Sequence, residues 1–144
     1  MRPPVLYGGA LLAALLLGWF WPLGILRYSI ALCLGIALLV LGLAIAIPAR
    51  RALRAAGTNV DPMRPASAVV TSGPYRFSRN PLYVALTLLY TGLSLIFDTW
   101  WGIVLLLPVL WVMHQGVVRR EERYLERKFG GAYRQYRSRV RRYV

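Results

Sequence analysis

The sequence predicts an all-α integral membrane protein with four transmembrane helices, a cytoplasmic loop and an amphipathic C-terminal helical tail. Hydrophobic residues make up 58% of the 144 residues, yet the net charge is +13, from 18 basic and 5 acidic residues. An apolar chain with this excess of positive charge is typical of a membrane protein with basic cytoplasmic parts. Because a chain of this length is usually one domain, we predict a single membrane domain over residues 1–144.

Four apolar segments are predicted to span the membrane, over about 5–21, 30–47, 82–97 and 99–118. A span needs about 20 mostly apolar residues, with about 17 at the short end, so the first and third segments are short. The first segment follows Arg2 and resembles a signal peptide. It ends in Trp19, Phe20 and Trp21, however, which favours an interfacial aromatic belt over a cleavage site. We therefore predict a retained span.

The basic residues predict the orientation. Six Arg lie between the second and third spans, ten basic residues follow the fourth, and only Arg27 lies between the first and second. Basic residues concentrate in cytoplasmic segments. We therefore expect an inner-membrane protein whose two termini, middle loop and tail are all cytoplasmic.

The two cytoplasmic regions differ in pattern. The middle loop, 48–80, is rich in Gly, Pro, Ser, Thr and Asn and is expected to be mostly irregular, with 68–70 able to run extended. The tail, 119–144, is predicted to be helical, with a break at Gly130 and Gly131. Its apolar residues recur at three- and four-residue steps, opposite an Arg-rich face: Leu125, Phe129, Tyr133, Tyr136, Val140 and Tyr143. Such a face predicts that the second half of the tail lies on the membrane surface.

Few residues suggest soluble-enzyme chemistry. No nucleotide-binding glycine pattern occurs, and the single Cys33 and single His114 exclude the usual metal-ligand clusters. His114 is interpreted as a helix-contact residue. The adjacent Glu121 and Glu122 have two readings: a surface salt-bridge cluster of little energetic value, or an inward carboxylate that binds a hydroxyl or amine.

The stretch Arg79-Asn80-Pro81-Leu82-Tyr83 also has two readings. In the first, Asn80 is the N-cap and Pro81 the first residue of a helix, and Arg79 anchors to lipid phosphate. In the second, the helix N-terminus, Arg79 and the rings of Tyr75 and Tyr83 hold a small zwitterionic ligand at the membrane surface.

Two segments carry a family resemblance. TSGPYRFSRNPLYVAL, residues 71–86, and REERYLERKFGGAYRQYRSRV, residues 120–140, resemble the isoprenylcysteine carboxyl methyltransferase family, whose wider kin include phospholipid methyltransferases. That family reads G-x-Y-x-x-x-R-H-P-x-Y in the first segment and E-E-x-x-L-x-x-x-F-G-x-x-Y-x-x-Y in the second. Both patterns occur here in order and spacing, and the resemblance covers about 60–144.

The resemblance implies a methyltransferase that uses S-adenosyl-L-methionine, held between 60–83 and 119–144. It implies main-chain contacts from Ser67, Ala68, Val69 and Val70 near the adenine. It also implies a pocket lined by Tyr75, Arg79, Asn80, Pro81, Leu82 and Tyr83, with Glu121 as a contacting acid and Glu122 beside it. Asn80 replaces the family's His and cannot act as a base. Val117 stands where eukaryotic enzymes carry a substrate-contacting Arg, so Arg119 or Arg120 is the candidate substitute.

The methyl acceptor is left open by the sequence. A lipophilic isoprenylcysteine-like carboxylate, lipid amine, phenol or thiol all remain candidates, with membrane lipids as partners and no nucleic acid. No catalytic base is assigned, and Arg79, Asn80 and Tyr83 are expected to position the reactants, since methyl transfer from a sulfonium needs alignment and desolvation. The alternatives are a nicotinamide-dependent membrane reductase related to sterol reductases, which are longer, and a non-enzymatic membrane protein with a lipid-binding basic tail.

Overall fold

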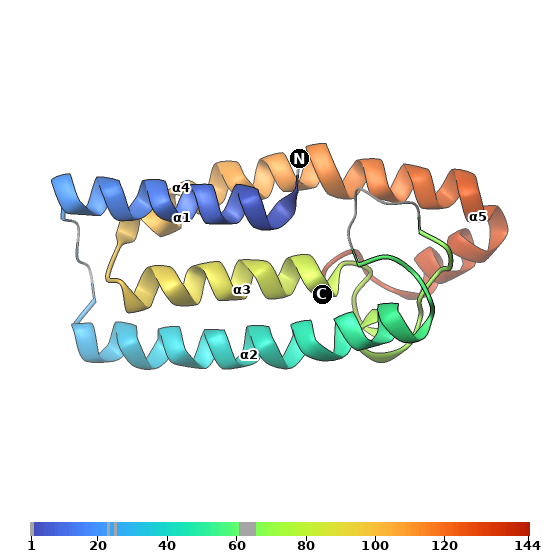
Figure 1. Cartoon of the computed structure of the whole chain (residues 1–144), viewed down its shortest axis with the longest axis horizontal. Helices are drawn as coiled ribbons and strands as arrows, with labels where there is room; N and C mark the ends of the chain where they lie inside the picture. Colours follow the sequence, from blue (N-terminus) through green and yellow to red (C-terminus); the bar gives the residue numbers. More distant parts are fainter. Residues whose placement is uncertain (1, 23, 25, 61–65) are drawn as a thin grey trace.

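The molecule is built from helices packed along one direction (Figure 1). The computed structural model describes residues 2–22, 24, 26–60 and 66–144, and this part of the chain contains no strand. A 3-10 turn, η1, precedes the third helix, and a π-helical turn, η2, joins the fourth helix to the fifth. The elements are α1 (Pro3–Phe20), α2 (Tyr28–Ala55), η1 (Gly73–Arg76), α3 (Pro81–Ile96), α4 (Trp100–Val112), η2 (Met113–Val118) and α5 (Arg119–Arg139).

The all-helical prediction is confirmed, and several helices are suited to a membrane. By length and composition, three described helices can cross a bilayer: α1, α2 and the continuous helix that runs from Trp100 to Arg139. The helix α3 is apolar but has only 16 residues. The apolar helices run alongside one another, with α2 against α3 and α1 against α4.

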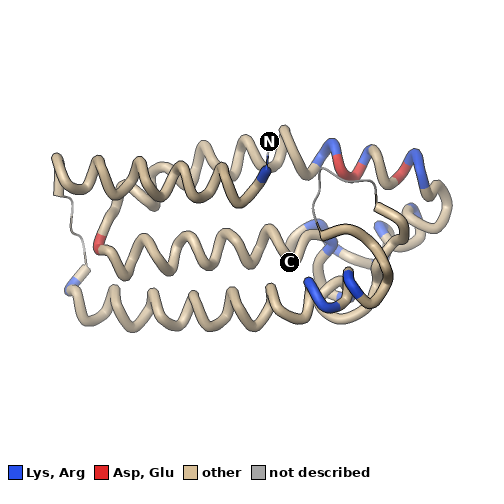
Figure 2. Tube along the Cα trace, viewed as in Figure 1, with Lys and Arg blue, Asp and Glu red and all other residues tan. Residues whose placement is uncertain are grey.

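Charged residues gather at one end of the helical bundle (Figure 2). Most Lys and Arg lie on α5, on the end of α2 and on the loop before α3, whereas the turns at the opposite end, before α2 and between α3 and α4, carry few charges. The long apolar stretches between the two ends carry no charge. The bundle therefore has one polar end that can hold a site for a charged ligand.

The helix α2 is longer than the predicted span. It continues through Pro48 to Ala55, into residues expected to be irregular. The extension reads Ala-Arg-Arg-Ala-Leu-Arg-Ala, and these residue types have high helix propensity. Residues 66–70, by contrast, are irregular and form no strand.

The tail is kinked and turns back on the protein. Gly130 has φ of 51°, a conformation that favours glycine, so the predicted break at this position is confirmed. The prediction that the aromatic face rests on the membrane is wrong for Tyr133 and Tyr136, which are 1% and 8% exposed. After the kink these rings pack against the protein, because the loop before α3 offers a partner for the same apolar face.

Glycines allow α2 and α3 to approach closely. A Cβ at Gly35 would lie 2.7 Å from the carbonyl oxygen of Gly92, and a Cβ at Gly92 would lie 2.8 Å from the carbonyl oxygen of Gly35. Neither position has room for a side chain. This contact fixes the helix α3, whose first turn carries residues of the polar end.

We predict that Gly35→Leu lowers the free energy of unfolding by about 1–3 kcal/mol, because the new side chain must force α2 away from α3. Gly9→Leu is the control, since it adds the same side chain to a membrane helix at a position with nothing within 4 Å. Thermal unfolding in detergent measures the difference. Equal stability of the two variants would contradict the close contact.

Candidate functional site

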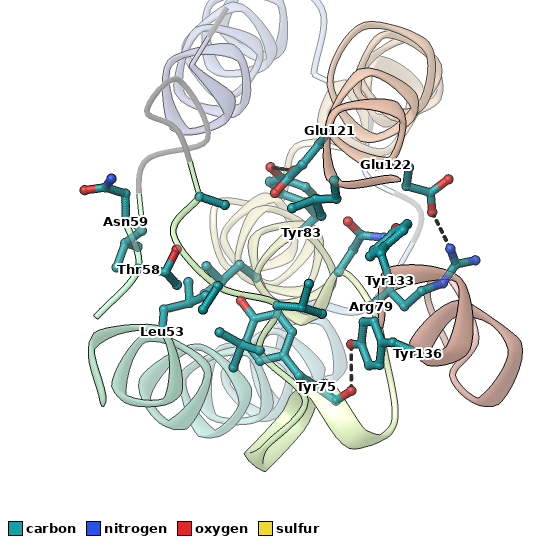
Figure 3. Close-up of a pocket in the computed structure, with 18 residues that line it drawn as sticks. Leu53, Thr58, Asn59, Tyr75, Arg79, Tyr83, Glu121, Glu122, Tyr133 and Tyr136 are labelled. Atoms are coloured by element: carbon teal, nitrogen blue, oxygen red, sulfur yellow. Dashed lines mark hydrogen bonds and ion pairs between the residues drawn. The ribbon is translucent and has the colours of Figure 1, made fainter. Parts of the chain in front are cut away.

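A polar cleft lies at the charged end of the bundle (Figure 3). It forms between the end of α2, the segments 58–60 and 66–70, the start of α3 and the helix α5. The cleft encloses about 100 Å³ and opens to solvent. Its lining residues are Leu53, Thr58, Asn59, Val60, Ala66, Ala68, Val69, Val70, Tyr75, Arg79, Asn80, Leu82, Tyr83, Glu121, Glu122, Leu125, Tyr133 and Tyr136.

The cleft brings together ten of the twelve residues expected to bind a cofactor. The other two, Ser67 and Pro81, lie beside it. The Ser67 backbone N–H donates to Thr58 Oγ1 at 2.9 Å, and its hydroxyl donates to the Gly57 carbonyl at 2.7 Å, so Ser67 is held against the turn that follows α2. Pro81 is buried as the first residue of α3 and fixes where that helix begins.

The hydrogen bond between Tyr83 and Glu121 joins the two segments that carry the family patterns. The Tyr83 hydroxyl donates to Glu121 Oε2 at 2.7 Å. Burial raises the pKa of Glu121, the hydrogen bond from Tyr83 opposes that rise, and the charge of Glu122 adds to it. Glu121 is therefore a carboxylate with a lowered tendency to ionise, held at the edge of the cleft.

Glu122 is buried and paired, so it does not belong to a surface salt-bridge cluster. Its side chain is 10% exposed, and Arg79 Nη1 lies 2.9 Å from Glu122 Oε1. Arg142 donates to both carboxylate oxygens, with Nε at 2.9 Å and Nη2 at 2.8 Å. Arg79, expected as an anchor for lipid phosphate or as part of a site for a zwitterionic ligand, is thus already paired with a carboxylate inside the protein (Figure 3).

The segment that follows α5, residues 140–143, which we call the C-terminal strap, crosses the start of α3. The Arg79 backbone N–H donates to the Arg141 carbonyl at 2.9 Å, and Asn80 Nδ2 donates to the Arg142 carbonyl at 2.9 Å. Asn80 occupies the N-cap position of α3, as the sequence predicted, but its side chain makes no capping bond. The amide binds the strap instead.

Three tyrosines form a buried wall on the side of the cleft next to η1. The Tyr136 hydroxyl donates to the Tyr75 carbonyl oxygen at 2.7 Å. Burial raises the pKa of Tyr75, Tyr133 and Tyr136 above the ordinary value for tyrosine. Their hydroxyls therefore remain neutral at physiological pH and can serve as hydrogen-bond donors and acceptors, but not as bases.

Sequence reasoning missed the roles of Tyr133 and Tyr136, although a signal was present. Both belong to the F-G-x-x-Y-x-x-Y pattern of the second segment, which is spaced like the family's. They were assigned to a membrane-facing surface because they also fit a helical apolar face. Leu53, Thr58 and Asn59 carried no such signal, since they reach the cleft through the unexpected extension of α2 and the turn after it.

A second hollow, the apolar cavity, lies next to the polar cleft. It measures about 490 Å³ and is lined from α1, α3, α4, η2 and the strap, chiefly by apolar and aromatic side chains. Tyr83 is the one described residue that lines both hollows. The polar cleft and the apolar cavity therefore share a wall at this side chain.

The two segments that carry the family patterns meet around one cleft of an all-helical protein, and comparison with known proteins places the chain in a family of membrane methyltransferases. The chain belongs to the phospholipid methyltransferase family, whose model matches residues 30–132. This confirms the resemblance to the isoprenylcysteine carboxyl methyltransferase-like group. An uncharacterized protein of Haemophilus influenzae is 41% identical over 56 residues, which is 39% of this chain and 79% of that protein. No solved structure matches the chain.

We predict that Glu122→Gln lowers the free energy of unfolding by about 3–5 kcal/mol, because it leaves the buried Arg79 without its counter-charge. Glu126→Gln is the matched control. Glu126 and its partner Arg137 have side chains 36% and 47% exposed, so its loss costs about 0–1 kcal/mol. Chemical denaturation in detergent measures both, and equal effects would contradict the central role of Glu122.

The raised pKa of Glu121 also predicts a pH dependence. Since the folded protein holds this proton more tightly than the unfolded chain, Glu121 contributes most stability below its ordinary value of 4.5. That contribution is lost as pH rises through the raised pKa. Glu121→Gln should remove this part of the pH dependence of the thermal midpoint, whereas Glu126→Gln should retain it. Identical profiles for Glu121→Gln and the unaltered protein would overturn the assignment.

Proposed function

We propose that this protein transfers a methyl group from S-adenosyl-L-methionine to a lipophilic acceptor at the cytoplasmic face of the membrane. The observation that carries the proposal is the 2.7 Å hydrogen bond from Tyr83 to Glu121, which joins the two family-patterned segments in one cleft. The family of the chain supports the reaction type. When bound, the cofactor supplies an electrophilic methyl group on a positively charged sulfur.

The residues of the polar cleft suit a nucleoside with an amino-acid arm. Apolar side chains of Leu53, Val70 and Leu82 offer a face for a planar base. The irregular backbone over 66–70 offers main-chain hydrogen-bonding groups, as expected for Ala68, Val69 and Val70. Glu121 is placed to accept hydrogen bonds from ribose hydroxyls or from an ammonium group.

Three tyrosine rings in the polar cleft suit a positively charged sulfur. The rings of Tyr75, Tyr83 and Tyr133 line the cleft together, and aromatic faces attract cations. We assign Arg79 to positioning, because its pairing with Glu122 holds the strap against the start of α3. Asn80 shares this positioning role through its bond to the Arg142 carbonyl. Glu122 also acts in positioning, through its pairing with Arg79 and Arg142.

We propose four membrane spans, with α3 as a short third span, and cytoplasmic termini. The charged end of the bundle then faces the cytoplasm, where the basic residues of α5 meet anionic lipid headgroups. A polar cofactor enters the polar cleft from water. A lipophilic acceptor reaches Tyr83 from the membrane through the apolar cavity, so the two reactants approach opposite sides of one side chain.

Cofactor binding tests the proposal. Purified protein in lipid nanodiscs should bind S-adenosylhomocysteine saturably in isothermal titration calorimetry. Tyr83→Phe and Glu121→Gln should each weaken binding about 10-fold or more, because a hydrogen bond to a charged group contributes about 1.5–3 kcal/mol. The controls are Tyr28→Phe, at the exposed start of α2, and Glu126→Gln. Absence of binding, or preference for a reduced nicotinamide cofactor, would refute the proposal.

A further inference from the structure

The apolar cavity restricts the charge of its occupant. Among the described residues that line it there is no Lys, Arg, Asp or Glu. Burying a carboxylate or an ammonium without a partner charge costs several kcal/mol or more, so a charged acceptor is disfavoured there. At about 490 Å³ the cavity falls within the usual range for small-molecule sites. A neutral, lipophilic molecule therefore suits this hollow better than a charged one.

Most polar side-chain atoms around the cavity already have partners within the protein. Thr87 donates to the Tyr83 carbonyl at 3.0 Å, so the Tyr7 hydroxyl, 2.8 Å from Thr87 Oγ1, is the donor of their shared bond. The Tyr83 hydroxyl donates to Glu121, and the Tyr143 hydroxyl lies 2.8 Å from His114 Nδ1. These hydroxyls are therefore engaged in holding the wall together.

Among the described lining residues, two groups differ: the indole N–H of Trp111, which can only donate, and the imidazole of His114. The imidazole borders the cavity, and no described residue forms a hydrogen bond with its second ring nitrogen, Nε2. When Nδ1–H donates to the Tyr143 oxygen, Nε2 carries the lone pair and can accept a proton. His114 lies in η2, and π-helical turns inside α-helices occur frequently at functional sites.

We propose that His114 is the general base for a neutral acceptor with an ionisable X–H group, a lipophilic phenol or thiol held in the apolar cavity. This inference rests on the proposed methyl transfer. The acceptor oxygen or sulfur forms a bond to the methyl carbon while the bond between that carbon and the sulfonium sulfur breaks. The electron pair stays on that sulfur, which becomes a neutral thioether, and the acceptor proton passes to His114 Nε2. The positive charge thus moves from sulfur to the imidazole and leaves with the proton to water.

The first experiment measures whether a ligand binds next to the imidazole of His114. Because His114 is the only histidine in the chain, selective labelling gives a single imidazole signal in NMR spectra of the full chain in nanodiscs. Titration with a 4-alkylphenol or an alkanethiol should shift that signal saturably, and a fatty acid or alkylamine of equal chain length should not. A shift with the fatty acid or amine alone would overturn the inference.

The second experiment separates a base from a structural residue. In His114→Asn the amide retains a partner for Tyr143 but lacks Nε2, so S-adenosylhomocysteine affinity should be unchanged while methyl transfer to the alkylphenol falls about 10²-fold or more. The loss should be smaller for a more acidic alkyl nitrophenol, since its proton needs less help to leave. Gln115→Asn, at the exposed neighbouring position in η2, is the control for that helix segment.

The outcomes distinguish the two proposals. Unchanged phenol methylation in His114→Asn would overturn the role of His114 but leave the proposed methyl transfer intact. The same conclusion would follow if the unaltered protein bound S-adenosylhomocysteine but methylated only carboxylates or amines. A protein that binds no S-adenosylhomocysteine fails the proposed function itself, and the inference with it.

Discussion

The buried carboxylate of Glu122 connects three segments that are distant in the sequence. It pairs with Arg79 from the start of α3 and with Arg142 from the C-terminal strap, while its own backbone belongs to α5. A buried charge that is paired on both sides is tolerated, whereas one left alone is costly. The strap, the start of α3 and the start of α5 are thereby held in one arrangement, and Glu121 is carried next to Tyr83.

The two adjacent glutamates Glu121 and Glu122 have different partners. Glu121 is adjacent in sequence but is turned toward the cleft, where its partner is a neutral tyrosine hydroxyl and not an arginine. Two neighbouring carboxylates thus have different environments: Glu122 holds the segments of the polar end together, and under the proposed function Glu121 presents a hydrogen-bond acceptor to the cofactor. The reading of the pair as a solvated surface cluster was wrong for Glu122 because its partners come from distant parts of the chain.

The sequence predicted those features that depend on local pattern. Hydrophobic runs indicated the helices, Asn80 and Pro81 marked where α3 begins, and Gly130 marked the kink in the tail. Prediction from the sequence failed where one pattern fits two environments. The apolar helical face with Tyr133 and Tyr136 has the same residue spacing whether it contacts lipid or protein. Arg142 could not be singled out from a run of arginines, since only the folded chain places it against Glu122. The apolar cavity likewise depends on how α1, α3, α4 and η2 pack, which residue spacing does not encode.

The shared wall at Tyr83 has a consequence for how such proteins diversify. Because it alone among the described residues lines both hollows, the remaining walls of the apolar cavity can be resculpted by mutation without disturbing the polar cleft. Under the proposed function, residues such as Val84, Leu88 and Leu110 can change in size and thereby admit other lipophilic acceptors, while the residues of the polar cleft stay the same. The choice of acceptor and the binding of the cofactor can then change independently, because Tyr83 is the one described residue that contributes to both sites.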